Sequence, residues 1–125
     1  MDTGKLNDYT FYIGYEGEPE LVLWTSEDGS KKLHVWEGYL TDIFDNTVLS
    51  DLGWRGLTRD YQEDLGAFAD SDEHIVEDVE EYLGDLRNYI GCSFRFEETE
   101  QVLISLINIF EEAISTENSV IMKME

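Results

Sequence analysis

Carboxylates are the residues of this chain whose number and spacing could do chemistry. Between Arg59 and Asn88 the sequence holds eleven Asp or Glu residues and only two Arg residues. Grouped carboxylates can act as a general acid and base, can bind a metal ion, or can form a surface that attracts a basic partner. Each possibility makes different demands on the surrounding residues.

A catalytic role for these carboxylates lacks the usual accompanying groups. His34 lies within a predicted strand and His74 near a predicted helix start, so we expect both to be structural or solvated. Cys92 has no neighbouring base and fits a small buried position. The sequence shows no nucleophile elbow, phosphate-binding loop, dinucleotide-binding loop or zinc spacing. We predict no catalytic residues and no enzyme activity; a small hydrolase is an alternative that rests on the carboxylates alone.

A calcium-binding loop starting at Asp70 fails at one position. Asp70, Asp72, Asp78 and Glu81 would occupy positions 1, 3, 9 and 12 of such a loop. Position 6 is Ile75, where the sharp turn of the loop requires glycine. We therefore predict no metal site and no cofactor.

A basic partner agrees with the overall composition. The chain has 125 residues, with 29 acidic and 8 basic side chains, and a formal net charge of −21 at pH 7. Such a field repels nucleic acid and anionic membranes and speeds association with basic proteins. Hydrophobic residues at 42% argue against disorder, so we expect residues 1–125 to form a single domain.

Features of the sequence also suggest a cellular location. The first residues lack the basic and apolar regions of a signal peptide, and Cys92 is the single cysteine. No apolar run approaches the ~18 residues that a membrane span needs. We expect a cytoplasmic protein that binds neither membranes nor nucleic acid directly.

Helical spacing predicts how the carboxylates are positioned. At about 100° per residue, one apolar stripe contains Ile75, Val76, Val79, Tyr82, Leu83, Leu86 and Ile90. The acidic side chains take the opposite side and face water. The pattern predicts a helix that is capped by Asp70 or Ser71 and stops at Gly91. A rigid element would then carry the acidic face.

Alternating side chains predict strands before this helix. Residues 9–15, 21–25 and 33–37 fit three strands of an antiparallel meander, in which Trp24 and Trp36 can share one face. Residues 38–51 fit a short helix or a loop equally well. Thr58 is a plausible N-cap for a short helix that ends before Gly66.

The remainder of the chain completes the predicted fold. Residues 93–96 fit a short strand, residues 97–115 a helix with a broad apolar stripe, and residues 119–124 a last strand. The fold class is therefore α+β: an antiparallel β-sheet, made of an N-terminal three-stranded meander and a C-terminal strand, packed against two main α-helices.

Two motifs stand out against this background, GWRGLTRDY at 53–61 and DVEEYLGDL at 78–86. With the C-terminal helix and strand that follow, they resemble a family of bacterial contact-dependent growth inhibition immunity proteins, over roughly residues 10–124. The resemblance implies a small cytoplasmic protein that binds and neutralises the toxic C-terminal domain of a cognate delivered toxin. Such domains are commonly nucleases and often cleave tRNA.

The residues themselves indicate a binding face. Trp54 and Tyr61 are candidate anchors, because aromatic residues dominate interface hot spots, but with Leu57 they could equally close the end of the core. Gly56 permits a positive backbone angle in this turn. The proposed acidic face consists of Asp60, Glu63, Asp64, Asp70, Asp72, Glu73, Glu77, Asp78, Glu80 and Glu81.

An acidic face of this kind suits a nuclease as partner. A nuclease must attract a polyanion, so its substrate groove is basic and oriented carboxylates can cover it. We expect a one-to-one complex with a basic toxin domain. The alternative is an acidic nucleic-acid mimic or anti-restriction inhibitor, which would inhibit several enzymes rather than one.

Overall fold

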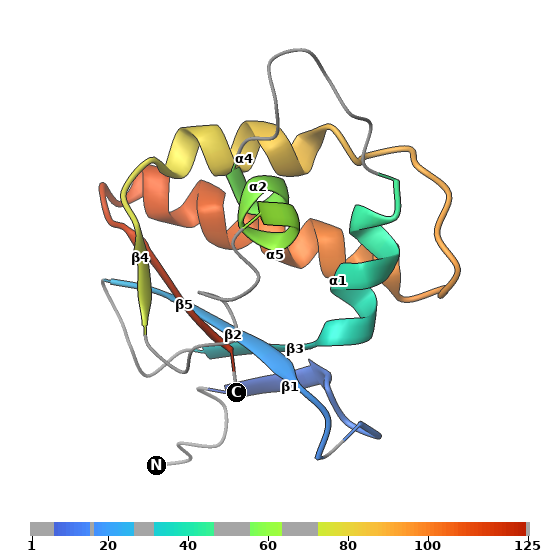
Figure 1. Cartoon of the computed structure of the whole chain (residues 1–125). Coiled ribbons are helices and arrows are strands. Elements are labelled where there is room, and N and C mark those ends of the chain that lie inside the picture. The colour runs from blue at the N-terminus through green and yellow to red at the C-terminus, as the bar shows by residue number, and fades with distance from the viewer. Residues whose placement is uncertain (1–6, 16, 27–31, 47–55, 64–72, 125) are drawn as a thin grey trace.

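A computed structural model describes residues 7–15, 17–26, 32–46, 56–63 and 73–124. In chain order, the elements are β1 (Asn7–Phe11), β2 (Glu20–Thr25), β3 (Lys32–Trp36), α1 (Glu37–Phe44), α2 (Gly56–Glu63), β4 (His74–Val76), α4 (Val79–Arg87), α5 (Thr99–Ser115) and β5 (Val120–Met124). The strands form a five-stranded sheet, and Figure 1 shows the helices on one side of it. The predicted α+β class is confirmed.

Apolar residues at alternate positions build the centre of the sheet. β2 pairs antiparallel with both β3 and β5, so that Leu23 lies opposite Leu33 on one side and Met122 on the other. These side chains are buried in the core shared with the helices. The strands predicted at 21–25, 33–37 and 119–124 are therefore confirmed, with their ends shifted by one residue at most.

The predicted meander is wrong at its first strand, which spans Asn7–Phe11 rather than 9–15, because residues 12–14 form a turn. The sheet order is β1-β3-β2-β5-β4, and β1 runs parallel to β3. The chain leaves β1 at Phe11, passes the end of β3 and enters β2 on its far side. Two turns accompany this crossing: the Tyr15 N–H donates to the Tyr12 carbonyl, and the Glu18 N–H donates to the Tyr15 carbonyl, each at 3.0 Å. Alternation predicts a strand but does not say which strand it will pair with.

Helix α5 closes the core. Its buried stripe comprises Thr99, Val102, Leu103, Leu106, Ile107, Phe110 and Ala113. In Figure 1, α5 lies between the sheet and α4, and the ring of Tyr82 on α4 stacks on Phe110 with centroids 5.8 Å apart. The helix predicted at 97–115 is confirmed. Within the ambiguous stretch 38–51, residues up to Phe44 form α1, whereas residues 47–51 lie outside the described part.

The acidic helix begins later than its periodicity predicted. α4 starts at Val79, and His74–Val76 is instead strand β4, which pairs antiparallel with β5. Val76 lies opposite Val120 and is buried, while Ile75 is 58% exposed. The ladder gives these backbone groups partners from a distant segment, which a local pattern cannot reveal.

The apolar stripe of α4 is nevertheless correct over the helix itself. The buried residues are Val79, Tyr82, Leu83 and Leu86. The helix ends at Arg87, short of the predicted stop at Gly91, and Ile90 is 63% exposed. The predicted caps at 70 and 71 lie outside the described residues, and the helix starts beyond them.

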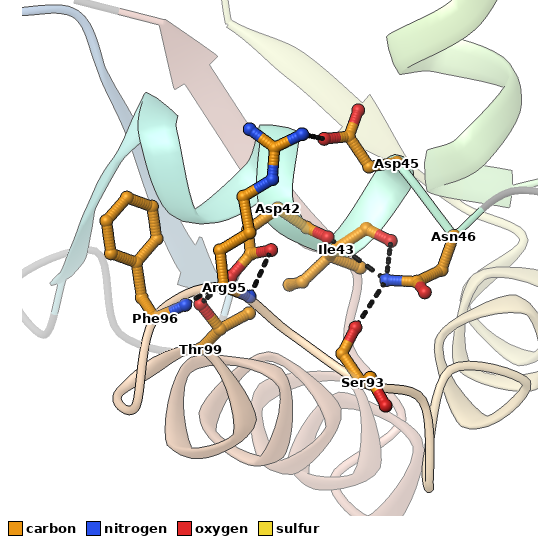
Figure 2. Close-up of polar contacts among 8 residues, drawn as sticks. All are labelled: Asp42, Ile43, Asp45, Asn46, Ser93, Arg95, Phe96 and Thr99. Carbon is orange, nitrogen blue, oxygen red and sulfur yellow. Dashed lines mark hydrogen bonds and ion pairs between the residues drawn. The ribbon is translucent and has the colours of Figure 1, made fainter.

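The predicted strand at 93–96 is also wrong, because α1 binds this segment. The buried Asp42 carboxylate accepts hydrogen bonds from the N–H groups of Arg95 at 2.8 Å and Phe96 at 3.0 Å (Figure 2). It also accepts one from the Thr99 hydroxyl at 2.6 Å. The Asn46 side chain donates to the Ser93 carbonyl at 3.2 Å. These contacts tie the end of α1 to the start of α5.

The same contacts set the charge of Asp42. Burial is the largest influence and would raise the pKa of this carboxyl group. The hydrogen bonds from Arg95, Thr99 and Phe96, together with the Arg95 charge, outweigh burial and lower the pKa below its ordinary value of 3.8. Asp42 is therefore ionised at neutral pH.

We predict that Asp42→Ala lowers the free energy of unfolding by about 2 kcal/mol near neutral pH, because buried donors lose their acceptor. The folded pKa lies below the unfolded one. Ionised Asp42 therefore stabilises the fold above pH 3.8, and this contribution is lost as the pH falls further. Urea titrations of both proteins at about pH 7 and about pH 3 measure the effect. A penalty of equal size at both pH values would contradict stabilisation by the ionised carboxylate.

Candidate partner-binding surface

Exposed carboxylates gather where β4 leads into α4. We name this group the α4 acidic surface; it comprises Glu73, Glu77, Asp78, Glu80 and Glu81. The first four are exposed and Glu81 is half-buried. Among the residues described, no Lys or Arg forms an ion pair with any of the four exposed members. Their mutual repulsion is therefore available to be relieved by a cationic partner.

A close backbone approach at Gly56 fixes α4 against α2. Gly56 has a φ of +59°, as its predicted role in a turn requires. A Cβ atom at this position would lie 2.9 Å from the Asp85 Cβ and 3.1 Å from the Tyr82 Cα. Glycine therefore allows the start of α2 to sit directly on α4.

Asp85 caps α2 from the neighbouring helix. Its carboxylate accepts hydrogen bonds from the Thr58 N–H at 2.9 Å and the Thr58 hydroxyl at 2.8 Å. The same hydroxyl lies 2.6 Å from the Tyr89 hydroxyl. First-turn N–H groups have no acceptor within their own helix, so an outside carboxylate supplies one. The N-cap role predicted for Thr58 is wrong: Thr58 lies inside α2 and receives the cap.

The other predicted contact residues fall into two groups. Three belong to α2, with side chains outside the described part of the structure: Asp60, Tyr61 and Glu63. Four lie outside the described residues altogether: Trp54, Asp64, Asp70 and Asp72. The structure thus brings together the carboxylates of 73–81, and the anchor roles of Trp54 and Tyr61 stay predictions. Leu57 is buried, as expected if this turn closes the core.

An aromatic cluster at the end of β3 was not predicted from the sequence. We name it the aromatic platform; it comprises Tyr15, Trp36, Tyr39 and Phe96. Tyr15 stacks on Trp36 with ring centroids 3.8 Å apart and planes 2° from parallel. The ring centroid of Trp36 lies 5.3 Å from that of Tyr39 and 5.5 Å from that of Phe96. The nearest sequence signal is Gly38, where a Cβ would lie 2.3 Å from the Trp36 ring.

Trp24 and the two histidines have separate surroundings. Trp24 is only 6% exposed, and the Lys32 ammonium lies 4.6 Å from its ring centroid. On the same face of the sheet, Nδ1 of His34 contacts the carboxylate of Glu20, and both residues are buried. His74 is exposed at the start of β4. Within the described ranges, no group of three or more His, Cys, Asp or Glu residues is placed to hold a metal ion.

We predict that Asp85→Ala destabilises the protein by about 1 kcal/mol or more, the usual effect of removing a helix cap. Glu80→Ala is the matched control, because Glu80 lies on the same helix with an exposed side chain. Its effect should stay within about 0.5 kcal/mol. Urea denaturation of the two variants measures the difference, and equal losses would show that the cap contributes nothing.

Comparisons with known proteins do not assign a role to this surface. No helix in the described part of the chain is long and apolar enough to cross a membrane. No protein-family model, curated protein or solved structure matches this chain.

Proposed function

We propose that this chain is a cytoplasmic immunity protein that binds the C-terminal toxin domain of a cognate contact-dependent growth inhibition system. It neutralises that domain in a one-to-one complex. The domain is a nuclease, and in the more specific form of the proposal it cleaves tRNA. The α4 acidic surface carries the proposal. Four of its carboxylates are exposed and form no ion pair with a Lys or Arg among the described residues, on a chain of net charge −21; these are Glu73, Glu77, Asp78 and Glu80.

Electrostatics supports a basic partner over other classes. A nuclease groove must be positive to hold its substrate, so it is complementary to a row of carboxylates. The charge of this chain would speed encounter with such a groove and disfavour nucleic acid itself. Inhibition then needs only occupancy of the groove, and no turnover by the inhibitor.

The packing of α4 supports a preformed binding surface. The helix is held on one side by the Asp85 contact to Thr58, and on another by the stacking of Tyr82 on Phe110. Leu86 is fully buried beneath it. Glu80 and Glu81, which lie on this helix, keep their backbone positions when a partner arrives, so less entropy is lost on binding.

The test uses the toxin domain encoded next to the gene for this chain. The wild-type protein should bind that domain and abolish its nuclease activity. Glu77→Gln with Glu80→Gln should slow association several-fold at low salt, within the ~10- to 1,000-fold range that charge steering can supply. Raising the salt should slow wild-type association, because screening acts beyond about 8 Å at physiological ionic strength.

A control with the same change in net charge separates position from total charge. Gln101→Lys with Asn108→Lys changes the net charge by the same two units in the positive direction, but at exposed positions on α5. Association of this control should slow less. If both double variants associate equally slowly, the position of the α4 acidic surface has no special role. A toxin domain that stays active in the presence of the wild-type protein would contradict the proposed function. Inhibition of many unrelated DNA-binding enzymes would instead favour the nucleic-acid mimic.

A further inference from the structure

The aromatic platform exposes a substantial part of its surface. Phe96 is 38% exposed, and Tyr15 and Trp36 are half-buried. Ile13, beside Tyr15 in the β1–β2 connection, is 70% exposed. Large apolar side chains that gather at the surface often mark a contact site for another molecule.

The rings of the platform pack on a buried residue. Tyr39 is 5% exposed and packs edge-on against Trp36 and Phe96. Burial, followed by a hydrogen bond with Tyr15 and the charges of Tyr15 and Glu98, raises the pKa of Tyr39 to about 12. Its hydroxyl therefore stays protonated at neutral pH. A partner would meet rings whose positions are already set.

Two carboxylates act on these rings. Glu18 accepts a hydrogen bond from the Trp36 indole N–H at 3.2 Å, and the charge of Glu98 acts on Tyr39. Glu37 and Glu97 follow Trp36 and Phe96 directly in the chain. The nearby cation, Arg95, pairs with Asp45 at 3.3 Å, and Figure 2 shows its guanidinium turned away from the Phe96 ring. Among the described residues, the charges that act on the platform rings are thus those of carboxylates.

We propose that the aromatic platform is a docking surface for an arginine-bearing segment of a basic partner protein. A guanidinium group can lie flat on an aromatic ring while it donates two hydrogen bonds to a carboxylate. Rings beside Glu18 and Glu98 offer both features together. Lysine, a compact and strongly hydrated charge, uses such a surface less well. The identification of the partner as the toxin domain rests on the proposed function above.

The platform is separate from the α4 acidic surface. In Figure 1, α4 begins beside β4 at one side of the molecule, whereas the 92–98 segment and the start of α1 lie at the other side. Substitutions on one surface therefore leave the other intact. The two surfaces can be tested independently.

The first experiment measures dissociation from the toxin domain encoded beside this chain. Phe96→Ala should dissociate about tenfold faster than the wild type, as expected for loss of an aromatic anchor. Ile104→Ala is the matched control, because Ile104 is a large apolar residue that is 46% exposed on α5, eight residues beyond Phe96. Its dissociation rate should not change. Glu98→Lys repeats the test without removing an apolar group, because Glu98 is exposed and its charge acts on Tyr39. It should also weaken binding. Unchanged dissociation in Phe96→Ala and Glu98→Lys would overturn the proposal and leave the immunity function standing.

The second experiment does not need the toxin domain. Isotope-labelled protein is titrated with nona-arginine and nona-lysine peptides while the Trp36 indole and Phe96 signals are followed by NMR. The platform should bind the arginine peptide several-fold more tightly, and Phe96→Ala should lose that preference. Equal binding of the two peptides would overturn the proposal even if the immunity function fails. A wild-type dimer that Phe96→Ala dissociates would also overturn it, because the platform would then bind a second copy of the chain.

Discussion

Two carboxylates, the buried Asp42 and the half-buried Asp85, join the helices of this protein to one another. Asp42 on α1 binds the backbone that leads into α5, and Asp85 on α4 caps α2. A carboxylate removed from water must find donors, and each of these finds N–H and hydroxyl groups on a different element. Each one therefore joins two elements in a single arrangement. The excess of acid in this chain serves the interior as well as the surface.

Local periodicity predicted the elements whose pattern agrees with their packing. The stripe from Val102 to Ala113 became α5, and the alternation in β2 and β5 gave the centre of the sheet. Prediction failed where a distant segment decides the structure. The residues of β4 fit the same helical stripe as α4, and only their pairing with β5 makes them a strand. β1 overlaps its predicted strand only over residues 9–11, and its parallel neighbour depends on how the chain crosses the end of β3.

The candidate site divides along the same line. Charge is a local property, so the exposed carboxylates at Glu73, Glu77 and Glu80 could be found from the sequence. The use of Asp85 could not, because its partner Thr58 lies 27 residues earlier in the chain. The aromatic platform could not be predicted for the same reason: Tyr15 reaches Trp36 through the β1–β2 connection, and the contacts of Asp42 bring Phe96 to them.

The strand order also explains why such a platform is available. The connection from β1 to β2 must pass the end of β3, and the stacking of Tyr15 on Trp36 joins the two at that point. Rings fixed by this contact lose little side-chain freedom when a partner binds. In the proposed complex, the α4 acidic surface would act through water over about 8 Å and so govern encounter, whereas the rings would act only after water is expelled and so govern release. One association would thus be controlled at two steps by two surfaces, each formed by contacts that the fold already requires.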